Sequence, residues 1–159
     1  MGSDLFITVE GIFYRAVDPA HLATSLAGSR AAGRHSSPAQ PTLYLSATPE
    51  GVNAAMKAHR DARSAQLRTL RVEVFAQKVF DLRDADRRAR AGISLEEATA
   101  PWQDRVAQGL RPSSWDVRDR LVALGAAGVI DPSRQSAGLW HLVLFAWNAQ
   151  NAPTARLLD

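Results

Sequence analysis

The sequence contains no cysteine, and that absence alone excludes several kinds of site. A chain without cysteine forms no disulfide, no thiolate zinc site and no cysteine nucleophile. No apolar run approaches the roughly 18 residues that would span a bilayer, and the N-terminus lacks the basic and apolar segments of a secretory signal. We therefore expect a cytoplasmic protein that makes no contact with a membrane.

Metal-binding and nucleophilic patterns are also missing. The four histidines have no spacing that would assemble a metal site, and the zinc-helix pattern HExxH is absent. We predict no metal. No Ser-His-Asp arrangement is evident along the chain either, so a nucleophilic serine is not expected.

Lysine is scarce, because only Lys57 and Lys78 contribute to the 19 basic residues. The formal net charge of +3 therefore comes mostly from arginine, the side chain that matches phosphate with two parallel hydrogen bonds. A pI near 9.9 also fits nucleic-acid binding, yet no helix-turn-helix, zinc spacing or aromatic RNA-binding motif is present. We favour a solvated basic surface over direct binding of nucleic acid.

The length of 159 residues fits one domain over residues 1–159, with 46% hydrophobic and 22% charged residues as in ordinary globular proteins. Periodicity and capping signals predict alternating strands and helices. The expected elements of the first half are a strand within 5–17, a short helix through Leu26, a loop over 27–40, a strand at 42–46, a helix from 48 to about 63, and one long or two consecutive strands over 68–82.

The second half begins with a charge-rich segment, 82–109, that suits one or two surface helices. Ser113 or Ser114 can cap a helix that runs through Leu124 and ends at Gly125. The segments GVIDPS and LWHLVLFAW follow as the last two strands. The expected fold is one α+β domain with a mixed or antiparallel sheet and flanking helices.

Residues 11–49 hold the first candidate site residues. Arg15 ends an apolar strand, where a buried guanidinium needs an acid or a bound anion, so it is either a ligand for an anion or a partner of Asp18. Arg30 and Arg34 flank GSRAAGR, whose small residues would let backbone amides approach a phosphate. His35 is expected on the loop surface. Gly-rich loops are common, and this one lacks the P-loop pattern.

Three further residues have both a structural and a functional reading. The ring of Tyr44 could stack on a nicotinamide or simply pack on the sheet. Glu50 could stabilise a cationic ribose or simply favour the start of its helix. Ser133 in DPSRQ could donate a hydrogen bond to a phosphate or ribose, or belong to a simple turn, with Arg134 beside it. Trp115, Trp140 and Trp147 suit a core.

The segments AGRHS and LYLS, with DPSRQ and the closing WHLVLFAWN, resemble the RES family of bacterial toxins over nearly the whole chain. That resemblance implies an ADP-ribosyltransferase-like fold that acts on NAD+ as substrate. It implies Arg15 and Arg34 at the diphosphate, Tyr44 at the nicotinamide, Glu50 at the ribose and Ser133 as a polar contact. Many RES members carry their glutamate further along the helix, where this chain has Ala55 or Met56.

The resemblance further implies the toxin of a type II toxin-antitoxin system, which cleaves the nicotinamide-ribose bond as a glycohydrolase or phosphorylase, or transfers ADP-ribose to a protein target. The implied partner is an Xre-like antitoxin, through which nucleic acid is contacted only indirectly. The displaced glutamate keeps an alternative open, in which the chain is a catalytically degenerate RES-like or basic binding module without NAD+ turnover.

Overall fold

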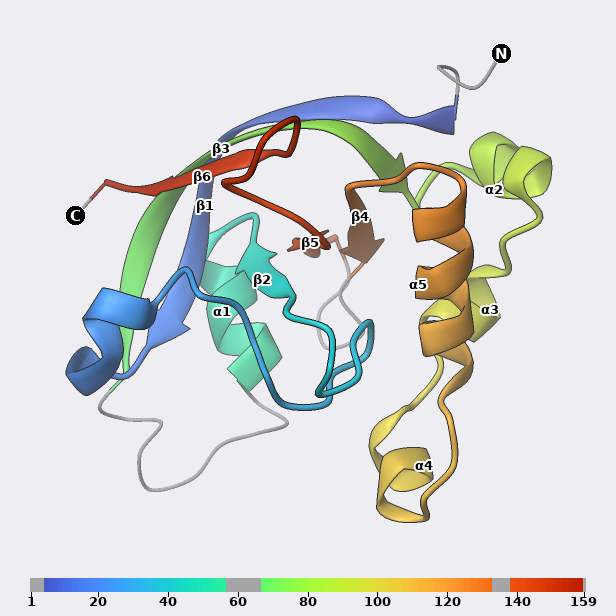
Figure 1. The fold of residues 1–159 in the computed structure, drawn as a ribbon, viewed down its shortest axis with the longest axis horizontal. Coiled ribbons are helices and arrows are strands. Elements are labelled where there is room, and N and C mark those ends of the chain that lie inside the picture. Colours follow the sequence, from blue (N-terminus) through green and yellow to red (C-terminus); the bar gives the residue numbers. More distant parts are fainter. Residues whose placement is uncertain (1–4, 57–66, 133–137, 159) are drawn as a thin grey trace.

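The fold is a single α+β domain, and the computed structural model describes residues 5–56, 67–132 and 138–158 (Figure 1). The helix expected to continue past Met56 and the predicted site residue Ser133 lie partly or wholly outside the described residues. The elements in chain order are β1 (Ile7–Val17), the 3-10 helix η2 (Pro19–Thr24), β2 (Leu43–Ser46), α1 (Pro49–Met56), β3 (Arg68–Asp81), α2 (Ala85–Ala91), α3 (Leu95–Ala98), α4 (Gln103–Ala107), α5 (Ser113–Ala123), β4 (Gly128–Pro132), β5 (Trp140–Leu144) and β6 (Thr154–Leu157).

The sheet is mixed and curls back on itself. Its strand order is β1-β2-β5-β4-β3-β6, and β1 also pairs with β3, so five strands form a closed ring with β6 added along β3. Only β3 and β4 run parallel to one another, whereas the other pairs are antiparallel. Figure 1 shows β1 and β3 crossing together over the other strands. The sequence predicted a mixed or antiparallel sheet, and the sheet is mixed; β6 was not predicted.

β3 is one long strand with a local irregularity. Every second residue from Leu70 to Ala76 is buried, and the buried face then shifts to Val79. Lys78 has a φ of 60°, and the register with β1 shifts between Ile7 and Val9. Between these paired positions β3 has one residue more than β1. This extra residue forms a β-bulge, which increases the twist of the strands and helps the sheet to curl. The change in the alternation of apolar and polar residues after Ala76 is therefore caused by this bulge.

Two hydrophobic clusters form on opposite faces of the ring. Leu43 and Leu45 of β2 join the first cluster, which the curled sheet encloses, together with residues such as Phe13 and Leu142. Alternate strand residues point to opposite faces, so Tyr44 packs against the second cluster. That second cluster joins the outer face of β4 and β5 to α2, α3 and α5, which Figure 1 shows beside β4.

The helical half differs in two details from the prediction. Residues 82–109 contain three short helices rather than one or two, with Asp84 and Ser94 as the caps that start α2 and α3. The predicted caps of α5 are wrong, because Pro112 stands at the cap position. The Ser113 hydroxyl instead donates to the Glu97 carbonyl, so it fastens α5 to α3. Gly125 does follow the helix end, with a φ of 104°.

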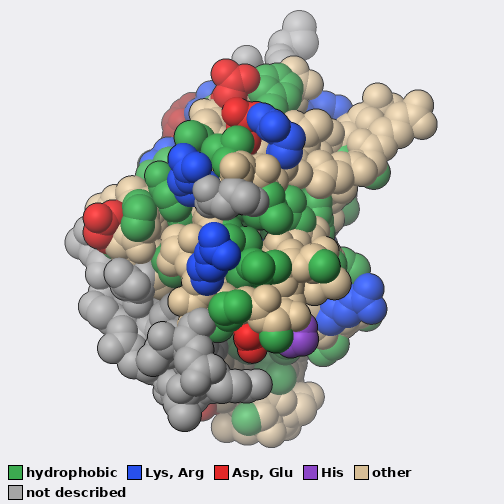
Figure 2. Space-filling model, turned by 90° about the vertical axis from the view of Figure 1, so that its left-hand side faces the viewer, with side chains coloured by type: hydrophobic (Ala, Val, Ile, Leu, Met, Phe, Trp, Pro, Cys, Tyr) green, Lys and Arg blue, Asp and Glu red, His purple; other side chains and the backbone are tan. Residues whose placement is uncertain are grey.

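The described part of the chain contains no helix with the length and apolar character needed to cross a bilayer. Figure 2 shows one face of the molecule, on which Lys and Arg side chains stand apart among hydrophobic and neutral ones. A continuous basic stripe is the usual footprint of nucleic-acid binding. This face does not have one.

Candidate active site

The site is built on the loop between η2 and β2. The backbone amide of His35 and the hydroxyl of Ser36 both bond the hydroxyl of Tyr44, at 3.1 and 2.6 Å. Gly33 sits so close that a Cβ at this position would lie 2.5 Å from the Tyr44 hydroxyl oxygen. Burial raises the pKa of Tyr44. The Tyr44 hydroxyl therefore holds the loop against the sheet.

Helix α5 holds the same loop from the other side. Three consecutive loop carbonyls accept hydrogen bonds from its side chains: Trp115 Nε1 donates to Gly33 at 2.8 Å, the Ser114 hydroxyl to Arg34, and Arg118 Nη1 to His35 at 2.8 Å. Burial lowers the pKa of Arg118, whose guanidinium also lies 4.6 Å from the Phe145 ring centroid. Backbone groups held this firmly fix the direction of the Arg34 side chain.

Asp131, at the end of β4, gathers the two basic side chains of the loop. One of its carboxylate oxygens, Oδ2, lies 2.9 Å from His35 Nε2 and 3.4 Å from Arg34 Nη1. The side chains of His35 and Asp131 are 1% and 6% exposed, whereas that of Arg34 is 21% exposed. The expectation of a surface His35 is therefore wrong, because the loop folds its ring inward onto a buried carboxylate.

The charge balance keeps Asp131 ionised. Burial opposes ionisation, but the charge and hydrogen bond of His35 together with Arg34 outweigh it, and the pKa of Asp131 is lowered. Arg34 Nε, His35 Nδ1 and Asp131 Oδ1 are buried without a hydrogen-bond partner among the described residues. Buried polar atoms without partners cost about 1–3 kcal/mol each. Such local costs are typical of functional sites.

A polar row crosses four strands beside this cluster. The register places Tyr14 of β1 opposite Ser46 of β2, Ser46 opposite His141 of β5, and His141 opposite Asp131 of β4. Residues directly opposite on paired strands point to the same face. Strand pairing thus brings a serine, a histidine and an aspartate together, and no pattern in the sequence predicts that they are neighbours. They form no catalytic triad, because the described hydrogen bonds of Asp131 go to Arg34 and His35 rather than to His141.

Arg15 has a different environment from Arg34. Its Nε donates to the Ser25 carbonyl and its Nη1 to the Tyr44 carbonyl, both at 3.0 Å. Burial lowers the pKa of Arg15. Asp18, the alternative partner considered from sequence, instead accepts from the Ala20 amide at the start of η2. Arg15 is therefore fastened to backbone carbonyls of the site loop and of β2.

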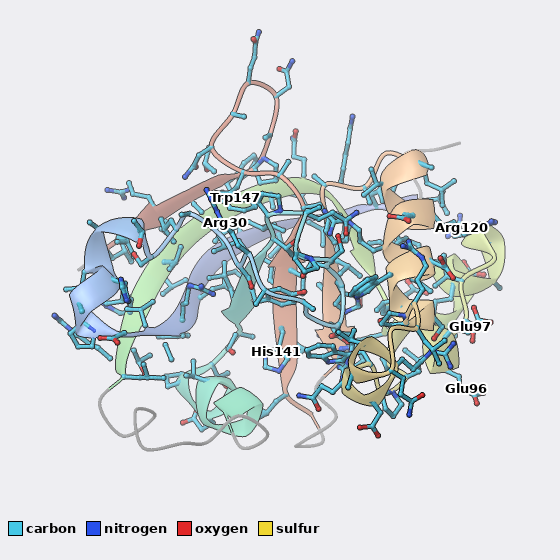
Figure 3. The ribbon with its side chains drawn as sticks, turned by 60° about the horizontal axis from the view of Figure 1, so that its bottom comes forward. Arg30, Glu96, Glu97, Arg120, His141 and Trp147 are labelled. Atoms are coloured by element: carbon cyan, nitrogen blue, oxygen red, sulfur yellow. The ribbon has the colours of Figure 1, made fainter. Side chains whose placement is uncertain are left out.

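Arg30 and Glu50 lie at the surface. Arg30 is exposed, and Figure 3 shows it apart from His141. Glu50 is exposed in the first turn of α1, where Thr48 provides the cap by accepting from the Gly51 amide at 3.0 Å. No described contact joins Glu50 to Arg34 or Tyr44. The role of Glu50 at the ribose stays a prediction.

Among the site residues predicted from sequence, Tyr44 bonds the backbone amide of His35, which follows Arg34, and Arg15 bonds the backbone carbonyl of Tyr44. Sequence reasoning missed Asp131, Arg118 and His141. Asp131 stands two residues before the predicted Ser133, so its proximity to the site was open to inference. Arg118 and His141 carried no such signal. Within the described ranges, no group of three or more His, Asp or Glu side chains could hold a metal ion.

The comparison with known structures finds a similar fold. One match is the crystal structure of the M. tuberculosis MbcT-MbcA toxin-antitoxin complex, with a TM-score of 0.62 and 16% sequence identity. The alignment covers 99% of this chain and 87% of the other. At this identity the likeness concerns the fold alone. No curated protein matches.

The comparison with family models identifies the family. The model of the RES domain matches residues 12–158. This range includes the second half of β1, all later helices and strands through β6, and the neighbouring side chains of Arg34, His35 and Asp131. A match of this extent covers both the sheet that forms the ring and the helices that pack on it. The chain belongs to the RES domain family.

Proposed function

We propose that this chain is the toxin of a type II toxin-antitoxin system and acts on NAD+, breaking the bond between nicotinamide and ribose. Three observations support this proposal. The RES domain model matches residues 12–158, the fold resembles a chain of a toxin-antitoxin complex, and Arg34 is held in place by Asp131. The Arg34 arrangement is the observation that carries the chemical part of the proposal.

The chemistry needs little more than positioning. Nicotinamide leaves NAD+ as a neutral ring because the pyridinium already carries a positive charge, so the enzyme must hold the diphosphate and stabilise the cationic ribose. Arg34 suits the diphosphate, because its guanidinium is partly exposed while its base is anchored. Asp131 takes up only part of that guanidinium, which leaves other N–H groups for phosphate oxygens.

The remaining roles follow the family resemblance and belong to the same proposal. Arg15 assists at the diphosphate, Tyr44 borders the nicotinamide, Glu50 approaches the ribose and Ser133 adds a polar contact. Water, phosphate or a protein side chain accepts the ADP-ribosyl group, which makes the chain a glycohydrolase, a phosphorylase or a transferase. No metal takes part. An Xre-like antitoxin neutralises the chain in the cytoplasm.

The first test is made in cells. Induced expression of the chain should stop growth and lower the NAD+ content, whereas the Arg34→Ala variant should do neither. Arg30→Ala is the matched control, because Arg30 is an exposed arginine of the same loop. Growth arrest with undiminished NAD+ would favour a protein target over NAD+ depletion. Growth and NAD+ unchanged by the wild-type chain would contradict the proposal.

A second candidate is a degenerate binding module without turnover. It is supported by the exposure of Glu50 and by the absence of any described contact between Glu50 and Arg34. Under this alternative, the purified chain binds nucleic acid with a strong dependence on salt and leaves NAD+ intact. Consumption of NAD+ by the purified chain excludes it.

A further inference from the structure

His141 occupies the middle of the polar row that runs from Tyr14 to Asp131. It begins β5, directly opposite Ser46 on one side and Asp131 on the other. The next inward residue on the same face, Val143, is buried in the second hydrophobic cluster. Figure 3 shows His141 at the end of β5 that lies toward α1. The row therefore marks the point where the apolar face of the sheet becomes polar.

The two ring nitrogens of His141 differ. Nδ1 lies 3.1 Å from the hydroxyl oxygen of Ser46. Nε2 has no hydrogen bond to any described residue, and the side chain is only partly buried. When Nδ1 carries the proton and donates to Ser46, Nε2 presents its lone pair outward. In this tautomer the hydrogen bond to Ser46 uses Nδ1, and Nε2 is the nitrogen that can act as a base.

The surroundings keep this imidazole neutral. Burial lowers the pKa of His141, Asp131 on β4 raises it in part, and Arg34 on the loop lowers it further. His35, bonded to the same Asp131, and Tyr14 on β1 are further titratable side chains of the described residues near this row. A neutral imidazole at neutral pH can accept a proton.

We propose that His141 is the general base of the site and takes a proton from the water molecule that accepts the ADP-ribosyl group. This inference rests on the proposed NAD+ cleavage. The water oxygen forms a bond to the anomeric carbon of the ribose, and the bond from that carbon to nicotinamide breaks with its electron pair staying on the ring nitrogen. The water proton goes to Nε2 of His141, which later releases it to solvent. The products are ADP-ribose and neutral nicotinamide.

The proposal separates two acceptors. Water needs a base because it becomes a good nucleophile only as it loses a proton. An inorganic phosphate dianion already carries negative oxygen and needs none. Loss of His141 should therefore slow hydrolysis much more than any cleavage by phosphate.

The test measures both reactions with purified His141→Gln, with His21→Gln as the matched control because His21 is exposed on η2. We expect His141→Gln to form ADP-ribose about 100-fold more slowly, to retain any phosphate-dependent cleavage, and to lose the decline in rate that the wild type shows as acid protonates His141. Ser46→Ala should cause a smaller loss, because it removes only the hydrogen bond at Nδ1 and leaves Nε2 in place. Thermal unfolding checks that each variant is folded.

Several results would overturn the assignment. If His141→Gln hydrolyses NAD+ within a few-fold of the wild-type rate, or if its pH profile is unchanged, His141 is not the general base. Equal losses of hydrolysis and phosphate-dependent cleavage assign His141 to substrate binding. If the wild type cleaves NAD+ only when phosphate is present, His141 is not a general base for water, but the proposed cleavage of NAD+ still holds. A wild type that cleaves NAD+ in neither condition removes the proposed function itself.

Discussion

At the scale of single residues, Asp131 organises the site. It is a buried carboxylate, and its Oδ2 atom lies 2.9 Å from His35 Nε2 and 3.4 Å from Arg34 Nη1. Arg15, predicted as an equal partner of Arg34, has two backbone carbonyls as its described partners. The sequence indicated that arginine side chains would bind the diphosphate. It could not distinguish an arginine that bonds the loop backbone from one that is oriented by a carboxylate.

Asp131→Asn should destabilise the protein. The amide keeps the shape of the carboxylate but loses its charge, so the buried His35 and the partly exposed Arg34 lose the negative charge that they share. We expect a loss of about 1–3 kcal/mol in the free energy of unfolding, measured by urea denaturation. Asp116→Asn is the control, because its ion pair with Arg111 is exposed and should contribute less than about 1 kcal/mol. Equal effects of the two changes would show that the contacts of Asp131 with His35 and Arg34 contribute no more stability than an exposed ion pair.

The same carboxylate predicts a dependence of stability on acid. The pKa of Asp131 is lower in the folded chain than its ordinary value of 3.8. A lowered pKa contributes stability that is full above the unfolded value and is lost as the pH falls from there toward the folded value. The free energy of unfolding should therefore fall below pH 3.8 with a slope that Asp131→Asn reduces. Parallel pH curves for the two proteins would contradict this account.

At the scale of elements, the site depends on a loop clamped between a strand and a helix. Tyr44 of β2 holds it on one side, and Ser114, Trp115 and Arg118 of α5 hold it on the other. Residues 27–40 were predicted as a loop because they lack a hydrophobic period. Their order comes instead from long-range hydrogen bonds that span up to 97 residues. No local pattern reports such bonds.

Gly33→Ala tests the clamp. An added Cβ would lie 2.5 Å from the Tyr44 hydroxyl oxygen and 3.0 Å from the ring carbon that bears it. The loop must then shift, so we expect lower stability and a loss of NAD+ turnover larger than the loss of stability explains. Tyr44→Phe removes the clashing oxygen, so the double variant should lose less than the sum of the two single losses. Strictly additive losses, from urea denaturation of all three variants, would contradict this close approach.

The same scale shows which elements a sequence can reveal. Strands β1, β2, β3, β4 and β5 carry runs of β-branched and apolar residues and were predicted within a few residues of their bounds. β6 was missed because TARL is short, and only two of its four residues are apolar. The polar row was missed because Ser46, His141 and Asp131 become neighbours only through strand pairing, across as many as 95 residues.

At the scale of the whole molecule, strand pairing around the ring turns separate segments into one site. β2 and β4 both end at the side of the sheet where β5 begins, so the polar row and the start of α1 lie together there. Two of the segments that carried the family resemblance, AGRHS and LYLS, contribute His35, Ser36, Tyr44 and Ser46 to this part of the molecule. The single α+β domain was predicted correctly, and the sheet is the mixed one of the two kinds that the sequence left open. The ring closure was not predicted, because β1–β3 pairing leaves no periodic signature.

The most direct test follows NAD+ in a reaction with the purified chain, free of any antitoxin, and separates the products by chromatography. We expect NAD+ to disappear and nicotinamide to accumulate in equal amount. Arg34→Ala should slow the reaction by about 10- to 100-fold, the value of a charge-assisted bond of roughly 1.5–3 kcal/mol. Arg30→Ala should leave it unchanged. Folded wild-type chain that leaves NAD+ intact, or an Arg34→Ala variant as active as Arg30→Ala, would contradict the account of this site.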